Sequence, residues 1–426
     1  MPSLFSFQKQ AVVELMGGKH IICSGCGSGK SAVAMYWAEQ KCKETNKRKV
    51  IVVTTASKTH ARNQNGDDDF TADARLFCSP SFVESLSSSL SLISWHKLAA
   101  WVSTNWKSLN EYVIILDEIQ KAGAGASSGM GKAFLKLVKN NPDWAGFTGT
   151  PGDTYLKLYP FFTACGLVRN KTSFLAEFAN VQTYKGYPEI VGWRNEDKLK
   201  AMWAMISYAP DTSKVMAELP SEAHKVITFT KPKTYSKILR TRCNENGEFL
   251  DTSGALCSEL RRQCFTKDKR EWVKDFVENL EAGAVMFYNF IRTGDELEQV
   301  VSKALPPGAR VWRVDGTHHE IPTAETTGPR DIVLCQWQSG SEAINLQHLH
   351  YWVAIELCYS YSTAIQGRGR IKRVGQKMPM TFWYLLTVNT IEQDILKCLK
   401  NKGTFAEDVW CASNNINVKE EDGNTD

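Results

Sequence analysis

The segment from Ser24 to Ser31 reads S-G-C-G-S-G-K-S and constrains the fold more than any other part of the chain. It follows a short apolar run, 20–23, and precedes a helical pattern over 32–39. Glycines let backbone amides turn toward phosphate oxygens, and a helix N-terminus adds partial positive charge. We therefore predict a phosphate-binding loop rather than the alternative, a glycine-rich turn before a core helix. The residues expected to contact nucleotide phosphates are Ser24, Gly25, Cys26, Gly27, Ser28, Gly29, Lys30 and Ser31.

Two residues of this loop have specific predicted roles. Lys30 is expected to reach the β- and γ-phosphates of a nucleotide, and the Ser31 hydroxyl is expected to bind magnesium. Ser24 replaces the first glycine of the usual G-x-x-x-x-G-K-[ST] pattern. This substitution indicates one branch of the nucleotide-hydrolysing proteins.

Composition is that of a globular protein with two or three domains. The chain has 426 residues, 43% of them hydrophobic and 23% charged, and its net charge of +5 permits a polyanionic partner without requiring one. Its 12 cysteines lack paired spacing, which favours reduced thiols and a cytoplasmic location. Cys23 and Cys26 form a C-x-x-C without a second pair nearby, so we expect no zinc site. With neither a signal peptide nor a long apolar run in view, we expect no membrane partner.

Short β-branched runs separated by helical stretches predict a parallel sheet in each half of the chain. The runs are 50–54 and 112–116, then 284–287, 309–314, 331–335, 351–357 and 381–386. The predicted fold is therefore α/β, with two lobes that each contain a mostly parallel sheet covered by helices. The predicted domains are a first lobe (1–170), a connecting helical or mixed segment (171–280), a second lobe (281–412) and an acidic, disordered tail (413–426).

An acidic pair, Asp117-Glu118, directly follows the run 112–116. Carboxylates at the end of a buried strand suit a magnesium site beside a phosphate loop. Asp117 is expected to hold the ion, and Glu118 is expected to polarise the attacking water as a general base. The alternative is two charges that simply reach solvent. Farther along, T-G-T-P at 148–151 supplies small hydroxyl residues that can relay the state of the γ-phosphate.

In this order the motifs resemble those of the superfamily two helicases and translocases, and in particular the Swi/Snf-like branch. Residues 366–376 (Q-G-R-G-R-I-K-R-V-G-Q) are similar to the sixth motif of that branch, Q-x-x-G-R-x-x-R-hydrophobic-G-Q. Residues 339–347 (S-G-S-E-A-I-N-L-Q) resemble its fifth motif, and T-I-E at 390–392 is also typical. The similarity covers nearly the whole chain, from about 7 to about 400. The alternative for 366–376 is a basic, solvated helix face.

The resemblance implies two RecA-like P-loop NTPase lobes with the ATP site in the cleft between them. Arg370 and Arg373 would act as arginine fingers, because guanidinium groups stay charged and bind phosphoryl oxygens. Glu342 and Gln366 would also contribute to cofactor binding. Gln8, just upstream of the loop, would read adenine, unless it is an ordinary surface glutamine.

The resemblance further implies a nucleic-acid motor, with DNA preferred and gripped through its backbone without sequence specificity. The residues expected to couple ATP hydrolysis to this grip are Gln120, Thr148 and Thr150. Those expected to contact nucleic acid are Thr54, Ser94, Lys97 and Ser339. An RNA helicase of the same superfamily, or a nucleotide-binding switch or scaffold that does not translocate, is the alternative.

The chain departs from the branch at several positions. Gln120 replaces the commoner histidine, Ser341 and Ala343 replace glycines of the fifth motif, and the usual W-N-P before the sixth motif is absent. The large insertions of chromatin remodellers are missing too. The compact form resembles DEAD/DEAH-like helicases encoded by bacteriophages and mobile elements. This resemblance implies the cytoplasm of a host cell, and phage or host replication and recombination proteins as partners.

Overall fold

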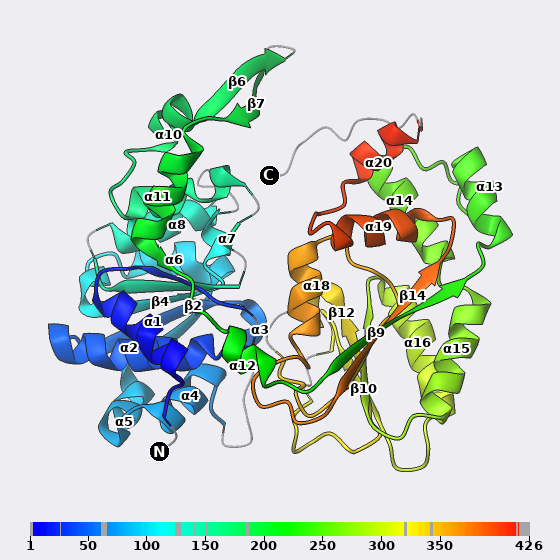
Figure 1. Cartoon of the computed structure of the whole chain (residues 1–426), viewed down its shortest axis with the longest axis horizontal. Helices are drawn as coiled ribbons and strands as arrows, with labels where there is room; N and C mark the ends of the chain where they lie inside the picture. The colour runs from blue at the N-terminus through cyan, green and yellow to red at the C-terminus, as the bar shows by residue number, and fades with distance from the viewer. Residues whose placement is uncertain are drawn as a thin grey trace. The chain divides into compact units, whose positions relative to one another are not determined.

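The computed structural model describes residues 3–25, 27–60, 66–123, 129–139, 141–149, 151–152, 154–184, 187–318, 322–340, 344–414 and 416. The chain divides into two compact units, Met1–Ala217 and Glu218–Asp426. Each unit contains one parallel sheet with helices on both faces (Figure 1), which confirms the predicted α/β fold with two sheet-containing lobes.

The sheet of the first unit has six strands in the order β3-β2-β4-β5-β1-β8, and neighbouring strands are parallel throughout. The strands are β1 (Ile21–Cys23), β2 (Lys49–Thr54), β3 (Leu90–Ser94), β4 (Tyr112–Asp117), β5 (Trp144–Thr148) and β8 (Ser207–Tyr208). Because parallel strands end at the same edge of a sheet, the loops that follow them gather at that edge.

Side chains of the central strands alternate between two hydrophobic cores. In β4, Val113 and Ile115 belong to one core, whereas Ile114 and Leu116 belong to the other. One core is closed by α1 (Ser6–Met16), α2 (Lys30–Thr45), α4 (Asp69–Phe77) and α5 (Pro80–Ser89). The other is closed by α6 (Leu98–Thr104), α8 (Gly129–Val138), α9 (Tyr159–Ala164), α10 (Lys171–Phe178) and α11 (Glu196–Ile206) (Figure 1). Burial on both faces explains why these strands are continuous apolar runs in the sequence.

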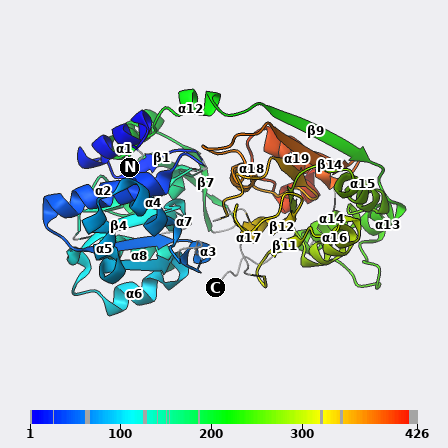
Figure 2. The same cartoon turned by 90° about the horizontal axis from the view of Figure 1, so that it is seen from below.

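The second unit also has a six-stranded, fully parallel sheet, in the order β11-β12-β10-β13-β14-β9. Its strands are β9 (Glu222–Phe229), β10 (Ala284–Tyr288), β11 (Val311–Val314), β12 (Ile332–Gln336), β13 (Tyr351–Ala354) and β14 (Met380–Thr387). One face carries α13 (Lys233–Thr241), α14 (Ser253–Gln263), α18 (Tyr361–Arg368), α19 (Ile391–Lys400) and α20 (Glu407–Ser413). The other carries α15 (Lys267–Glu278) and α16 (Ile291–Ala304). Figure 2 shows β9 beside β14 at the edge of this sheet.

Residues 171–280, expected to connect the lobes, divide between the two units. β8 pairs with β1 in the first sheet, and β9 pairs with β14 along its whole length in the second. Before β8, an antiparallel hairpin of β6 (Ala179–Tyr184) and β7 (Tyr187–Trp193) projects from the first unit (Figure 1). None of these strands was predicted from the sequence; β8 is very short, and β9 is largely exposed.

Short elements complete the two units. They are α3 (Ala56–His60), α7 (Gln120–Gly123), α12 (Ser213–Ala217), α17 (Trp337–Gly340) and the 3-10 turns η1 (Trp95–Lys97), η2 (Leu109–Glu111) and η3 (Tyr155–Lys157). Over the described ranges, no helix has both the length and the apolar character needed to cross a bilayer.

Candidate active site

The predicted phosphate loop joins β1 to the first turn of α2. Gly27 and Gly29 have φ angles of 78° and 74°, a left-handed conformation that favours glycine. The hydroxyls of Ser24 and Ser28 lie 2.8 Å apart, and the Ser28 hydroxyl donates to the Gly25 carbonyl at 2.9 Å. The two serines therefore brace the loop from within, while α2 begins at its end.

Gln8 lies directly against this loop. Its side-chain amide donates to the Ser28 carbonyl at 2.9 Å, and its carbonyl oxygen accepts the Phe5 backbone N–H at 2.9 Å. A Cβ atom at Gly29 would lie 2.5 Å from Nε2 of Gln8. The left-handed backbone therefore favours glycine at position 29, and a larger residue there would also displace the Gln8 amide.

Lys30 begins α2 and folds back over the loop. Its ammonium donates to the backbone carbonyls of Ser24 at 3.1 Å and Gly25 at 3.2 Å. Ser31, the next residue of the helix, is half-buried. Both predicted side chains are thus at the N-terminus of a helix, where backbone dipoles favour an anion.

The ends of five neighbouring strands bring the other predicted residues to the same edge of the sheet. Ser94 ends β3, Thr54 ends β2, Asp117 ends β4 and Thr148 ends β5. The backbone N–H of Ser24, just after β1, donates to the Thr148 carbonyl at 3.0 Å. The strand order therefore brings residues that are far apart in sequence to one edge of the sheet.

Asp117 is the buried carboxylate of this edge. Its Oδ2 accepts hydrogen bonds from the Thr54 hydroxyl at 2.7 Å and from the Lys58 ammonium at 2.8 Å. Burial alone would raise the pKa of the Asp117 carboxyl, but the nearby Lys58 and Thr54 outweigh burial and hold that pKa below its usual value. The indole of Trp95 donates to the Asp117 carbonyl at 2.8 Å and fixes the strand end.

These residues fit a magnesium ion. A carboxylate and a hydroxyl are oxygen ligands that Mg²⁺ prefers, and Asp117 and Ser31 supply them. The ammonium of Lys58 occupies Oδ2 of Asp117, so a bound ion would have to displace it or use the other carboxylate oxygen. The positive charge of Lys30 also contributes to lowering the pKa of the Asp117 carboxyl.

Glu118 has an unusual backbone conformation, with φ at 50°. A left-handed residue other than glycine is uncommon and often marks a functional site. Gln120 donates from its side-chain amide to Oε2 of Glu118 at 2.5 Å, and the N–H of Ile119 donates to the Phe147 carbonyl at 3.1 Å. The chain therefore turns sharply after β4, and Gln120 fixes the direction of the Glu118 carboxylate.

The arginines of the sixth-motif-like segment lie in the second unit, in and just after α18. Arg370 is buried and donates to the carbonyls of Gln366 and Ile344, both at 3.1 Å. Gln366 is buried on the same helix, whereas Arg373 is half-buried. Arg370 therefore ties the end of α18 to the fifth-motif-like segment, which contains Ile344.

The residues predicted to contact nucleic acid differ in exposure. Thr54 and Ser94 are buried, and the Thr54 hydroxyl is bonded to Asp117. Lys97 is exposed in η1. For Ser339 only the backbone, in α17, is described. The predicted residues Cys26, Thr150 and Glu342 lie outside the described residues.

Lys58 is the main charged residue at this edge of the sheet that was not predicted from the sequence. It stands in the segment T-T-A-S-K-T, which carries no recognisable pattern. It is the third residue of α3, which begins one residue after the end of β2, and this position is the local hint of a role. A lysine shortly after a strand that neighbours the Asp-Glu strand is a signal that can be sought in other chains.

No family model matches the chain, and no curated protein does. Among solved structures, the chain is similar to one described as the Sulfolobus solfataricus SWI2/SNF2 ATPase core in complex with dsDNA. The identity is 15%, the match covers 94% of this chain and 91% of that one, and the TM-score is 0.40.

Proposed function

We propose that the chain is an ATP-dependent nucleic-acid motor that hydrolyses ATP and steps along a DNA backbone. The observation that carries this proposal is the arrangement at one edge of the first sheet. There the loop 24–31 follows β1, and the pair Asp117-Glu118 ends a strand two places along the same sheet. A phosphate cradle beside an acidic pair is the combination that ATP hydrolysis requires.

Different residues of the first unit would bind the phosphates, hold magnesium and activate the attacking water. Backbone amides of the loop and Lys30 would bind the phosphates, and Ser31 and Asp117 would hold magnesium. The bound ion would neutralise charge that develops on the phosphoryl oxygens. Glu118, held by Gln120 at 2.5 Å, would orient the attacking water and accept its proton.

The second unit would supply a guanidinium group to the transition state. Arg373 is the better candidate, because it is half-buried, whereas Arg370 is buried and donates to two backbone carbonyls within its own unit. Arg370 would then keep α18 in place, while Arg373 contacts the transferring phosphoryl group when the units close. Gln366, and Glu342 as the resemblance implies, would add further contacts to the nucleotide.

A DNA partner is proposed on the motif resemblance and on the mild positive charge of +5. Lys97, exposed at the end of the first sheet, would contact a phosphate, so binding would weaken as salt rises. Thr148 and Thr150 would relay the nucleotide state to this surface. Nothing among the described residues indicates a bacteriophage origin or a DEAD/DEAH-type enzyme, and neither is proposed.

The test is ATP turnover measured in parallel without nucleic acid and with single-stranded DNA, duplex DNA and RNA. We expect DNA to stimulate turnover, and Lys97→Gln to raise the DNA concentration that gives half-maximal stimulation. Lys107→Gln, a change in the same unit outside the proposed site, is the matched control and should leave that concentration unchanged. Turnover that no nucleic acid changes would overturn the motor, and stimulation by RNA alone would replace DNA with RNA.

A further inference from the structure

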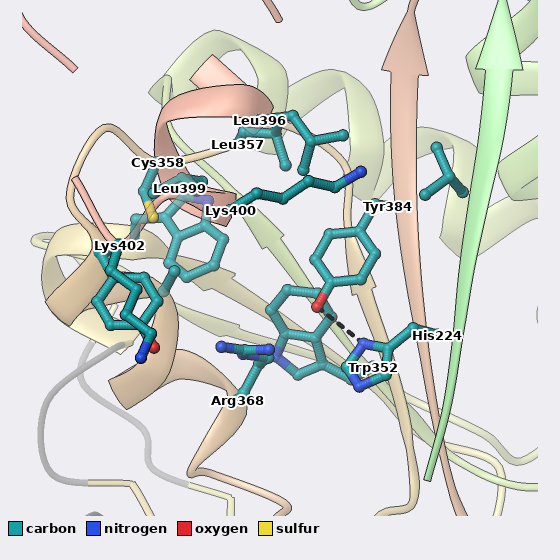
Figure 3. Close-up of a pocket in the computed structure, with 14 residues that line it drawn as sticks. His224, Trp352, Leu357, Cys358, Arg368, Tyr384, Leu396, Leu399, Lys400 and Lys402 are labelled. Atoms are coloured by element: carbon teal, nitrogen blue, oxygen red, sulfur yellow. Dashed lines mark hydrogen bonds between the residues drawn. The ribbon is translucent and has the colours of Figure 1, made fainter. Parts of the chain in front are cut away.

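The second unit contains a cavity of about 450 Å³ that no part of the proposed reaction uses (Figure 3). Its floor is formed by β13, β14 and β9, and its walls by α18, α19 and the chain around them. Protein interiors are normally close-packed, and ligand sites typically have volumes of about 300 to 1,000 Å³. The size of this cavity is therefore that of a small-molecule site.

Most of the lining is aromatic or aliphatic, and the polar atoms of its two indoles are already used. The indole N–H of Trp352 donates to the Gly367 carbonyl at 3.1 Å, and that of Trp337 donates to the Glu356 carbonyl at 2.8 Å. The rings therefore offer the cavity carbon surface and π-faces. His224 stacks with Tyr384, ring centroids 5.9 Å apart, and its Nδ1 lies 3.2 Å from the Tyr384 hydroxyl. Such a lining favours a flat aromatic guest.

The charged residues of the lining are all cations: Arg368, Lys400 and Lys402. No carboxylate is among the lining residues, and the nearby Glu222 pairs with Lys372 at 2.8 Å. In Figure 3 the guanidinium group of Arg368 lies next to the Trp352 ring. An aromatic cavity with only positive charge at its border is complementary to an anion.

We propose that this cavity binds a small planar aromatic molecule that carries a carboxylate, sulfonate or phosphate group. The ring would lie among Trp352, Tyr384 and Leu399, with the acidic group directed toward Arg368. The two lysines at the other part of the border would add long-range attraction. The binding site itself does not depend on the proposed ATPase.

The ligand would contact α18, the helix that directly precedes the segment containing Arg373. Tyr361, Ala364 and Arg368 are spaced along one face of α18 and line the cavity. Gln366 lies on another side of this helix, Arg370 follows its C-terminal end, and both are buried in the unit. A ligand bound in the cavity would therefore influence the position of the segment that contains Arg373. If the proposed function holds, the ligand is a regulator of ATP turnover.

The test uses two fluorescent probes with the same aromatic skeleton and the full chain. One is 8-anilinonaphthalene-1-sulfonate, and the other is the uncharged N-phenyl-1-naphthylamine. We expect one sulfonate probe to bind per chain. Arg368→Gln should weaken it roughly tenfold, because a charge-assisted hydrogen bond is lost, while affinity for the uncharged probe stays the same. The matched control is Lys397→Gln, an exposed lysine on α19 outside the lining, which should leave both affinities unchanged.

A second variant tests the location. Ala364→Trp places a large ring into the cavity and should abolish binding of both probes, with far-UV circular dichroism as the check of folding. If Ala364→Trp is unfolded, Arg368→Gln alone decides the outcome. Sulfonate binding that neither variant changes, or equal affinity of the wild-type chain for both probes, would overturn the proposal. ATP turnover is not needed for any of these readings.

Discussion

The ammonium of Lys58 lies 2.8 Å from Oδ2 of Asp117, at the carboxylate proposed to hold magnesium. The side chains are 18% and 5% exposed, so the pair is largely shielded from water. A lysine and a divalent cation would compete for the same carboxylate oxygen. Lys58 is therefore a counter-charge that the proposed metal must displace or accommodate.

Replacement of this lysine tests that relationship. Lys58→Met leaves Asp117 as a buried carboxylate without its cation, and we expect a loss of about 3 kcal/mol in the free energy of unfolding. Mg²⁺ should restore part of this loss, so that it raises the melting temperature more in Lys58→Met than in the wild-type chain. The measurement is thermal unfolding with and without Mg²⁺.

The matched control is Lys47→Met. Lys47 pairs with Asp143 at 2.6 Å, and the two side chains are 17% and 12% exposed. This variant breaks an ion pair of similar burial away from the phosphate loop. Stabilisation by Mg²⁺ that is equal in both variants would contradict a special role for Lys58.

The Glu118 carboxylate is predicted to be the base of the reaction. Glu118→Gln keeps the size and hydrogen-bonding reach of the side chain but cannot accept a proton, so turnover should fall roughly 100- to 10,000-fold. ATP affinity should change little, since the proposed phosphate contacts come from the loop. Turnover and binding of a fluorescent ATP analogue measure the two separately, and a variant that retains turnover would exclude Glu118 as the base.

Gln120 is predicted to position Glu118 rather than to react. Gln120→Ala removes the 2.5 Å hydrogen bond and should lower turnover at saturating ATP and DNA less than Glu118→Gln does. Unchanged turnover with a reduced melting temperature would indicate a purely structural residue.

The two arginines of the second unit are predicted to differ. Arg370→Lys loses the hydrogen bonds to Gln366 and Ile344 and should reduce the free energy of unfolding by about 1 to 3 kcal/mol. Arg373→Lys should reduce turnover about 1,000-fold, far more than Arg370→Lys does. Denaturation curves and ATPase rates on both variants check this division. The reverse pattern would assign the transition-state contact to Arg370.

His20 gives the fold a predicted dependence on pH. It stacks on Trp144 with ring centroids 4.3 Å apart, and burial lowers its pKa below the ordinary 6.5. The unfolded chain therefore takes up a proton near pH 6.5 while the folded chain does not. The contribution of His20 to the free energy of unfolding is fully present above pH 6.5 and declines as the pH falls below that value.

His20→Phe keeps a stacked ring without a titrating group. We expect the wild-type chain to lose more unfolding free energy between pH 7 and pH 5 than this variant does. Urea denaturation at both pH values provides the measurement. Equal losses of unfolding free energy in the two chains would show that His20 does not cause the pH dependence.

Local chemistry made part of the site predictable. The phosphate loop and the pair Asp117-Glu118 are contiguous patterns, and each lies next to an apolar run that marks a buried strand. The second sheet was predicted for the same reason. Their spatial meeting follows from parallel strands ending at one edge, a rule that holds without side-chain detail.

Contacts between distant segments were not predictable. Lys58 meets Asp117 only because β2 and β4 are neighbours in the sheet, and neither residue carries that information locally. Thr54 was predicted to contact nucleic acid, yet it is buried and its hydroxyl is bonded to Asp117. The cavity beside α18 draws on several separate segments, so no single stretch of sequence could reveal it.

The connection between the two units runs through an edge strand of each sheet. β8 has two residues, β9 has eight, and residues 209–221 join them. Tension along this connection would therefore act on the pairing of β8 with β1 and of β9 with β14. β8 holds few hydrogen bonds, so it would detach from β1 before β9 leaves β14. The weakest point under mechanical load therefore adjoins the strand that leads into the phosphate loop.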